Sequence, residues 1–177
     1  MNPKQLADQN VVQMERLQKD ALIDVEVYYI TDAKFAKQPN NGHSRIEQIR
    51  TRTTGQEIQF RKGDYLIPMN QPSNRFIMEV LEPGSLDSYL SWNFFNPIFD
   101  RREYFSPYGF EPNAINYLKK HPDLAKELER KKQAEPSFAR STYAQLNFIY
   151  ANSPYLEKGY RRYPVYRINE KIVHPGE

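Results

Sequence analysis

The feature that most constrains the fold is the separation of strand patterns from helix patterns along the chain. Residues 24–82 carry short alternating runs of β-branched and aromatic residues, such as "DVEVYYI" at 24–30, which is typical of half-buried strands. Residues 83–157 instead repeat apolar residues every three or four positions, with prolines near the predicted helix starts. Separate runs of strands and helices predict an α+β fold with an antiparallel sheet.

Each end of the chain adds one predicted element. Residues 1–23 are predicted to hold an amphipathic N-terminal helix, because Leu6, Met14 and Leu17 fall near three-and-four spacing. Residues 158–168 are predicted to form a closing C-terminal strand, around "YPVYRI". A length of 177 residues is ordinary for one domain, so residues 1–177 are expected to form a single domain.

The stretch "NRFIMEVLEPGSLDSYLSWNFF", residues 74–95, joins the two halves. Its pattern predicts a strand over Phe76–Leu81, a turn at Pro83 and Gly84, and a helix over Leu86–Phe95. Trp92 is the only tryptophan. We expect its indole to be largely buried, fastening the helical half to the strands.

The residues that usually carry enzyme chemistry form no known motif. The chain has no cysteine, which excludes disulfides, thiolate zinc sites and cysteine nucleophiles. None of its histidines, His43, His121 and His174, belongs to an HExxH motif, and no H-x-x-E pair is followed by a more distant His. The seven glycines form no phosphate-binding loop, and no G-x-S-x-G occurs. We therefore predict no catalytic residue, no metal ligand and no cofactor in this chain.

The charge and hydropathy patterns bear on partners. The net charge is only +3, and "KGYRRYPVYR" at 158–167 is the nearest approach to a basic aromatic patch. No run of about 18 apolar residues occurs, and the first residues lack the apolar core of a signal peptide. We expect neither a nucleic-acid partner nor a membrane span.

Several long blocks of sequence resemble a known family. They are "KGDYLIPMNQPSNRFIMEVLEPGSLDSYLSWNFFNPIFDRREYFSPYGFE" at 62–111, "FARSTYAQLNFIYANSPY" at 138–155 and "RYPVYRI" at 162–168. They look like the region that follows the catalytic domain in large bacterial zinc carboxypeptidases of the carboxypeptidase A clan. The resemblance covers roughly residues 24–168.

The resemblance implies a non-catalytic role. In the resembled family the zinc ligands, an H-x-x-E pair and a more distant His, lie in the upstream domain, and so do the catalytic Glu and the substrate-binding Arg. No H-x-x-E pair followed by a more distant His occurs here. The chain is thus expected to be an accessory domain of a zinc metallocarboxypeptidase-like protein, with zinc only in the upstream domain. The implied partners are that catalytic domain or a peptide substrate, and the implied location is periplasmic, cell-surface or secreted.

Two other functions stay open from the residues alone. A stand-alone glycan- or peptide-binding module would use the 13 Tyr residues and Trp92 as an aromatic platform. A small hydrolase would use carboxylates, for which Glu79, Glu82, Asp87 and Glu103 are candidates. The residues predicted to make a binding or interdomain contact are Glu82, Asp87, Ser88, Trp92 and Asn93.

Overall fold

The computed structural model describes residues 11–168. It divides the chain into two compact units, unit 1 (Met1–Phe99 with Arg161–Glu177) and unit 2 (Asp100–Tyr160). The single domain stays a prediction, because two compact units occur within one domain as well as in separate domains. The predicted α+β class with antiparallel sheets is confirmed.

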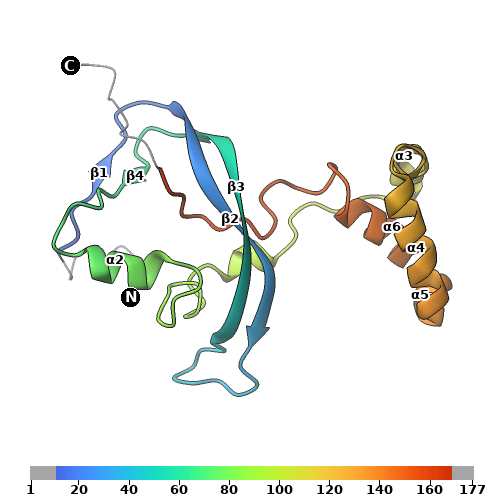
Figure 1. The fold of residues 1–177 in the computed structure, drawn as a ribbon, viewed down its shortest axis with the longest axis horizontal. Helices are drawn as coiled ribbons and strands as arrows, with labels where there is room; N and C mark the ends of the chain where they lie inside the picture. The colour runs from blue at the N-terminus through green and yellow to red at the C-terminus, as the bar shows by residue number, and fades with distance from the viewer. Residues whose placement is uncertain (1–10, 169–177) are drawn as a thin grey trace. The chain divides into compact units, whose positions relative to one another are not determined.

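Unit 1 is built on one long antiparallel hairpin (Figure 1), in which β2 (Ala21–Phe35) pairs with β3 (Ile46–Phe60). The predicted strand "DVEVYYI" lies within β2. The β-branched side chains of Val25 and Val27 are buried on one face of β2. Ile30 is buried further along the same strand.

A second, two-stranded sheet pairs β1 (Glu15–Arg16) with β4 (Tyr65–Leu66). The helix predicted within residues 1–23 is therefore wrong for the described part, while residues 1–10 lie outside the described residues. The backbone of this segment bonds to a distant segment, since the Leu17 N–H donates to the Asp64 carbonyl at 2.9 Å. Tertiary pairing has overridden an amphipathic pattern of weak helix propensity.

Two further predictions are wrong in residues 74–99, which follow the strands in sequence. Residues predicted as a strand form the helix α2 (Asn74–Leu81), because a short apolar run suits a strand or a helix equally well. The predicted helix over Leu86–Phe95 is instead a series of turns, followed by the 3-10 helix η1 (Asn96–Phe99). Asn93 has a φ of 71°, a left-handed conformation that a right-handed helix cannot contain.

Residues 161–168 return to the hairpin and complete unit 1. They meet β2 in two isolated bridges, Tyr29 with Arg162 and Glu26 with Arg167, where a continuous strand was predicted. Pro164 lies between the bridges and has no N–H to donate, which interrupts the ladder. Just before them, the Arg161 N–H donates to the Ile98 carbonyl at 2.8 Å.

The returning segment carries Tyr163, whose side chain is completely buried. Its ring packs with Ile30, Ile46 and Leu90 in the core of unit 1. Its hydroxyl donates to the Leu81 carbonyl at the end of α2, at 2.8 Å. One residue thus joins the returning segment, the hairpin core and α2.

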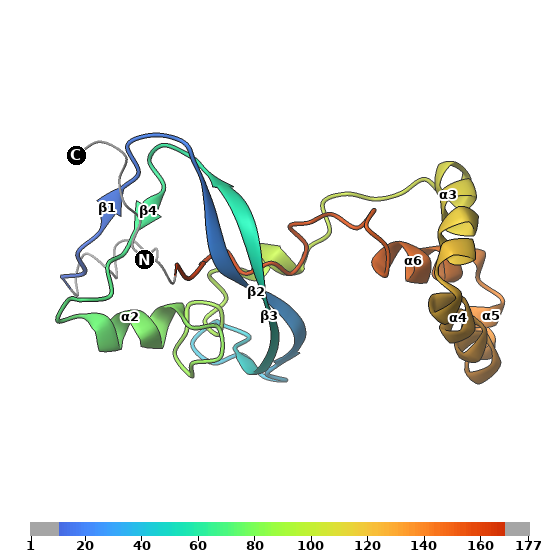
Figure 2. The same cartoon turned by 45° about the horizontal axis from the view of Figure 1, so that its top comes forward.

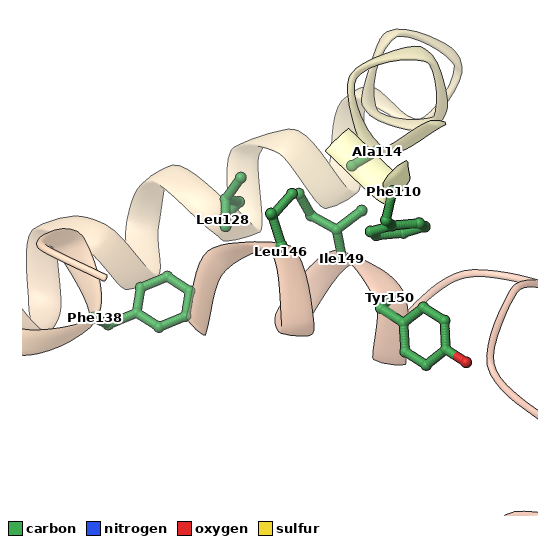
Figure 3. Close-up of a cluster of buried hydrophobic side chains, with 7 residues drawn as sticks. All are labelled: Phe110, Ala114, Leu128, Phe138, Leu146, Ile149 and Tyr150. Carbon is green, nitrogen blue, oxygen red and sulfur yellow. The ribbon is translucent and has the colours of Figure 1, made fainter. Parts of the chain in front are cut away.

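Unit 2 is helical (Figures 1 and 2). Its helices are α3 (Pro107–Lys120), α4 (Pro122–Ala134), α5 (Pro136–Ala139) and α6 (Thr142–Ala151). Pro122 and Pro136 begin helices as predicted, where the missing N–H costs nothing. Pro112 lies inside α3, because the helix already begins at Pro107. Figure 3 shows the buried cluster that holds these helices together: Phe110, Ala114, Leu128, Phe138, Leu146, Ile149 and Tyr150.

The substitution Tyr163→Phe tests the role of the Tyr163 hydroxyl, which donates to the Leu81 carbonyl in unit 1. It leaves the Leu81 carbonyl without its donor, and an unsatisfied buried acceptor costs about 1–3 kcal/mol. We expect the free energy of unfolding, measured by urea denaturation, to fall by about that amount. The matched control is Tyr155→Phe, at an exposed tyrosine of unit 2. Equal stabilities for the two variants would contradict the assignment.

Candidate functional site

Unit 1 contains an apolar pocket of about 240 Å³. Its walls come from the segment before β1, from β4 and the residues after it, from α2, and from the turns that follow α2. The lining side chains are all aliphatic or aromatic: Val12, Met14, Tyr65, Ile67, Phe76, Ile77, Val80, Leu81, Tyr89 and Phe95. The volume lies below the roughly 300–1,000 Å³ of drug-sized sites, so the pocket fits a small apolar group.

Helix α2 supplies one wall because its apolar residues share one face. Phe76 and Val80 are one turn apart, and so are Ile77 and Leu81. Ile77 and Val80, on this face, are buried. The Tyr89 N–H donates to the Val80 carbonyl at 2.8 Å, which brings the following turn, and the Tyr89 ring with it, against the helix.

Another wall is the irregular segment of residues 12–14, which the buried side chain of Gln71 holds in place. The Gln13 N–H donates to Gln71 Oε1 at 2.7 Å, and Gln71 Nε2 donates to the Gln13 carbonyl at 3.0 Å. The same amide group donates to the Pro68 carbonyl at 2.6 Å. Gln71 is only 6% exposed, so the amide pairs with the Gln13 backbone much as a neighbouring strand would. Val12 and Met14, on either side of Gln13, line the pocket.

The pocket lining can bind but has little chemistry to offer. Among residues 11–168, the only polar side-chain groups in the lining are the hydroxyls of Tyr65 and Tyr89. Burial raises the pKa of the Tyr89 hydroxyl above its ordinary value, so this group stays neutral over the physiological range. A site without a carboxylate, imidazole or amine in its lining favours ligand binding by desolvation of apolar surface.

The predicted site residue Glu82 lies in an ion-pair cluster outside the pocket lining. Its carboxylate contacts Arg167 at 2.6 Å, and Arg167 also lies 3.6 Å from Glu26. The hydrogen bond that Arg167 donates to the Glu82 carboxylate raises the pKa of the Arg167 guanidinium. Since this guanidinium also lies over the Tyr28 ring, at 5.3 Å, the cluster ties the returning segment to β2 and to the end of α2.

Asp87 and Trp92 belong to a second cluster, around Arg45. The Arg45 guanidinium lies 4.1 Å from the centre of the Trp92 ring and 3.2 Å from the Asp87 carboxylate. Trp92 Nε1 donates to the same carboxylate at 3.1 Å. His43 meets the indole edge-on, at 5.7 Å between ring centres. The indole is half-buried with one face covered by Arg45, so it is neither the largely buried core residue we expected nor a free aromatic platform.

Ser88 and Asn93 hold the turns between α2 and η1. Ser88 is completely buried, and its hydroxyl accepts the Ser91 N–H at 3.0 Å. Asn93 Nδ2 donates to the Ser44 carbonyl at 2.9 Å. The structure thus brings Asp87, Trp92 and Asn93 against the loop that contains Ser44. None of the five predicted site residues lines the pocket.

Three of the four carboxylates of the hydrolase hypothesis already have partners within unit 1. Glu79 accepts the Asp87 N–H at 3.3 Å, Asp87 pairs with Arg45 and Glu82 pairs with Arg167. Glu103 belongs to unit 2. Among residues 11–168, no three His, Asp or Glu side chains come close enough together to hold a metal ion.

Sequence reasoning missed the pocket. Two signals pointed toward it: the apolar Met14, which we interpreted as part of a helix within residues 1–23, and the apolar residues 76–81, which we interpreted as a strand. Both interpretations placed these residues in regular elements of a core, whereas they line an opening.

Comparison with known proteins found no match among protein families, curated proteins or solved structures. Within the part of the chain that the structure describes, no helix has the length and apolar character needed to cross a membrane. The function is therefore argued from the pocket and from the resemblance in sequence.

The substitution Gln71→Ala tests whether this amide builds the pocket wall. It removes three hydrogen bonds and leaves the Gln13 backbone without partners. We expect a loss of about 2–3 kcal/mol in the free energy of unfolding and faster hydrogen exchange at the Gln13 amide. Gln48→Ala, at an exposed position of β3, serves as the control. Unchanged protection of the Gln13 amide in Gln71→Ala would show that the wall holds without it.

Proposed function

We propose that this chain is a non-catalytic accessory domain of a zinc carboxypeptidase-like protein, and that it binds an apolar group in the pocket of unit 1. The observation that carries the binding role is the pocket itself, whose lining is apolar on every side. The accessory role is supported by the sequence resemblance over residues 24–168. The partner is the upstream catalytic domain or its peptide substrate, and the site of action is the periplasm, the cell surface or the outside.

The size and lining of the pocket define what it accepts. A dry apolar cavity of about 150 Å³ is enough to bind benzene. The present pocket, about 240 Å³, has room for a somewhat larger aliphatic or aromatic group. Burying such a group contributes roughly 25 cal/mol for each Å² of apolar surface removed from water, which is enough for weak, reversible binding.

A second candidate function, a stand-alone glycan- or peptide-binding module, is favoured by the surface of unit 2. Four tyrosines are exposed there: Tyr104 (77%), Tyr108 (92%), Tyr143 (54%) and Tyr155 (46%). Tyr143 stacks on Phe105, at 5.5 Å between ring centres, so its position is fixed by the core. Exposed rings of this kind suit stacking against a sugar or a peptide. We rank this function second because a pocket with several walls binds a small group better than single exposed rings do.

Titration with 1-octanol, a neutral probe with an aliphatic chain, tests the binding role. We expect octanol to shift the NMR signals of the pocket methyl groups, including Val80 and Ile77. The variant Val12→Phe fills part of the pocket with its own ring and should weaken octanol binding at least about tenfold, the equivalent of one lost buried side-chain contact. Leu22→Phe, at an exposed position of β2, is the matched control and should bind as the wild type does.

Two results would contradict the pocket as the binding site. One is an absence of octanol-induced shifts, and the other is equal binding by Val12→Phe and the wild type. A parallel titration with a soluble oligosaccharide separates the two candidate functions. Shifts at Tyr104 and Tyr108, with the pocket signals unmoved by octanol, would favour the glycan-binding module.

An assay for peptidase activity tests the non-catalytic role. The chain carries no H-x-x-E pair followed by a more distant His, and residues 11–168 hold no metal-binding cluster, so the zinc-ligand set of the resembled family is incomplete here. We expect the chain, with added zinc, to hydrolyse hippuryl and longer peptides no faster than the blank. Robust zinc-dependent hydrolysis that survives repurification would contradict the proposal.

A further inference from the structure

The mouth of the apolar pocket carries one positive charge. Tyr65 lines the pocket and is 43% exposed, so its ring lies where the pocket opens to solvent. The Arg16 guanidinium lies over this ring, 4.4 Å from its centre. Arg16 Nη2 also donates to the Tyr65 hydroxyl, and Nη1 donates to the Gly63 carbonyl at 3.1 Å. These contacts fix the guanidinium beside the opening.

The charge of Arg16 is not neutralised by the described part of the chain. Its guanidinium donates to a phenol and a carbonyl, and no described carboxylate forms an ion pair with it. The preceding residue, Glu15, alternates to the other face of β1. Met14, two residues before Arg16, lines the pocket, so the segment presents first apolar side chains and then a cation toward the same side.

We propose that the pocket of unit 1 binds an aliphatic monocarboxylate, with the hydrocarbon chain in the pocket and the carboxylate on Arg16. This inference rests on the proposed binding role of the pocket and names its ligand class. A guanidinium presents several N–H donors in one plane and matches a carboxylate in charge and shape. Two of its nitrogens already hold it in place, so little further ordering is needed when the ligand arrives.

A fatty acid fits this site better than a peptide does. A peptide brings amide groups that need hydrogen-bond partners once they leave water. The described part of the pocket lining offers only the hydroxyls of Tyr65 and Tyr89 as polar side-chain groups. An aliphatic acid has its polar atoms at one end, next to Arg16, and leaves none of them inside.

Calorimetric titration of the full chain with octanoate and with 1-octanol tests the assignment. Both probes have the same chain length, so they differ in the charge at the head. We expect octanoate to bind about two- to fivefold more tightly, the range of one partly exposed charge pair. Octylammonium, with the opposite charge, should bind more weakly than octanol.

The variant Arg16→Gln should abolish the preference for octanoate while octanol binds as before. Arg52→Gln is the matched control, because Arg52 is exposed and lies over another tyrosine ring, that of Tyr29, at 5.2 Å. It should keep the full preference. Unchanged octanol binding and urea stability in both variants would show that each one folds.

The outcomes separate this inference from the proposed function. Equal binding of octanoate and octanol to the wild type, or a preference that persists in Arg16→Gln, overturns the role of Arg16 and leaves the apolar pocket standing. A peptide ending in leucine that binds in the pocket more tightly than octanoate overturns the fatty acid as the ligand. Binding of neither octanol nor octanoate overturns the pocket as a site altogether.

Discussion

The structure of unit 1 depends on the burial of Tyr163. Its hydroxyl bonds to the last carbonyl of α2, and its backbone N–H donates to the Tyr28 carbonyl in β2 at 2.8 Å. Burial raises the pKa of this phenol well above its ordinary value, so it remains a neutral donor. The position of α2 against the hairpin, and with it one wall of the pocket, therefore rests on a residue more than 80 positions further along the chain. The ion pair of Glu82 with Arg167 supports the same junction from the surface.

The elements that could be predicted are those in which local pattern and tertiary environment agree. In β2 the alternation of Val25 and Val27 matches one buried face, and Pro122 begins a helix where the prolyl ring costs nothing. Where the two disagree, the environment decides. The segment around Met14 has a helical spacing of apolar residues, yet its hydrogen bonds go to Gln71 and to the strand after Gly63.

The candidate site could be predicted from the sequence even less well than the fold. Polar residues such as Asp87 and Trp92 attract attention in a sequence because their side chains can do chemistry, but in this fold they secure turns and loops. The pocket is made from ordinary apolar residues in separate segments, with Val12, Ile67 and Val80 as examples. Their convergence depends on tertiary contacts and leaves no motif. A single buried amide, that of Gln71, gives the opening its shape.

The hydrogen bond between the Arg161 N–H and the Ile98 carbonyl joins the two places where the chain leaves and re-enters unit 1. The polypeptide leaves unit 1 after Phe99 and returns to it at Arg161. The exit and the return are therefore neighbours in space, and unit 2 is topologically an insertion into unit 1. Closing such a loop costs only about 0.6 kcal/mol more for each doubling of its length. Unit 2 could therefore be exchanged for a short linker, or for a different module, with little thermodynamic penalty to the part of the protein that holds the pocket.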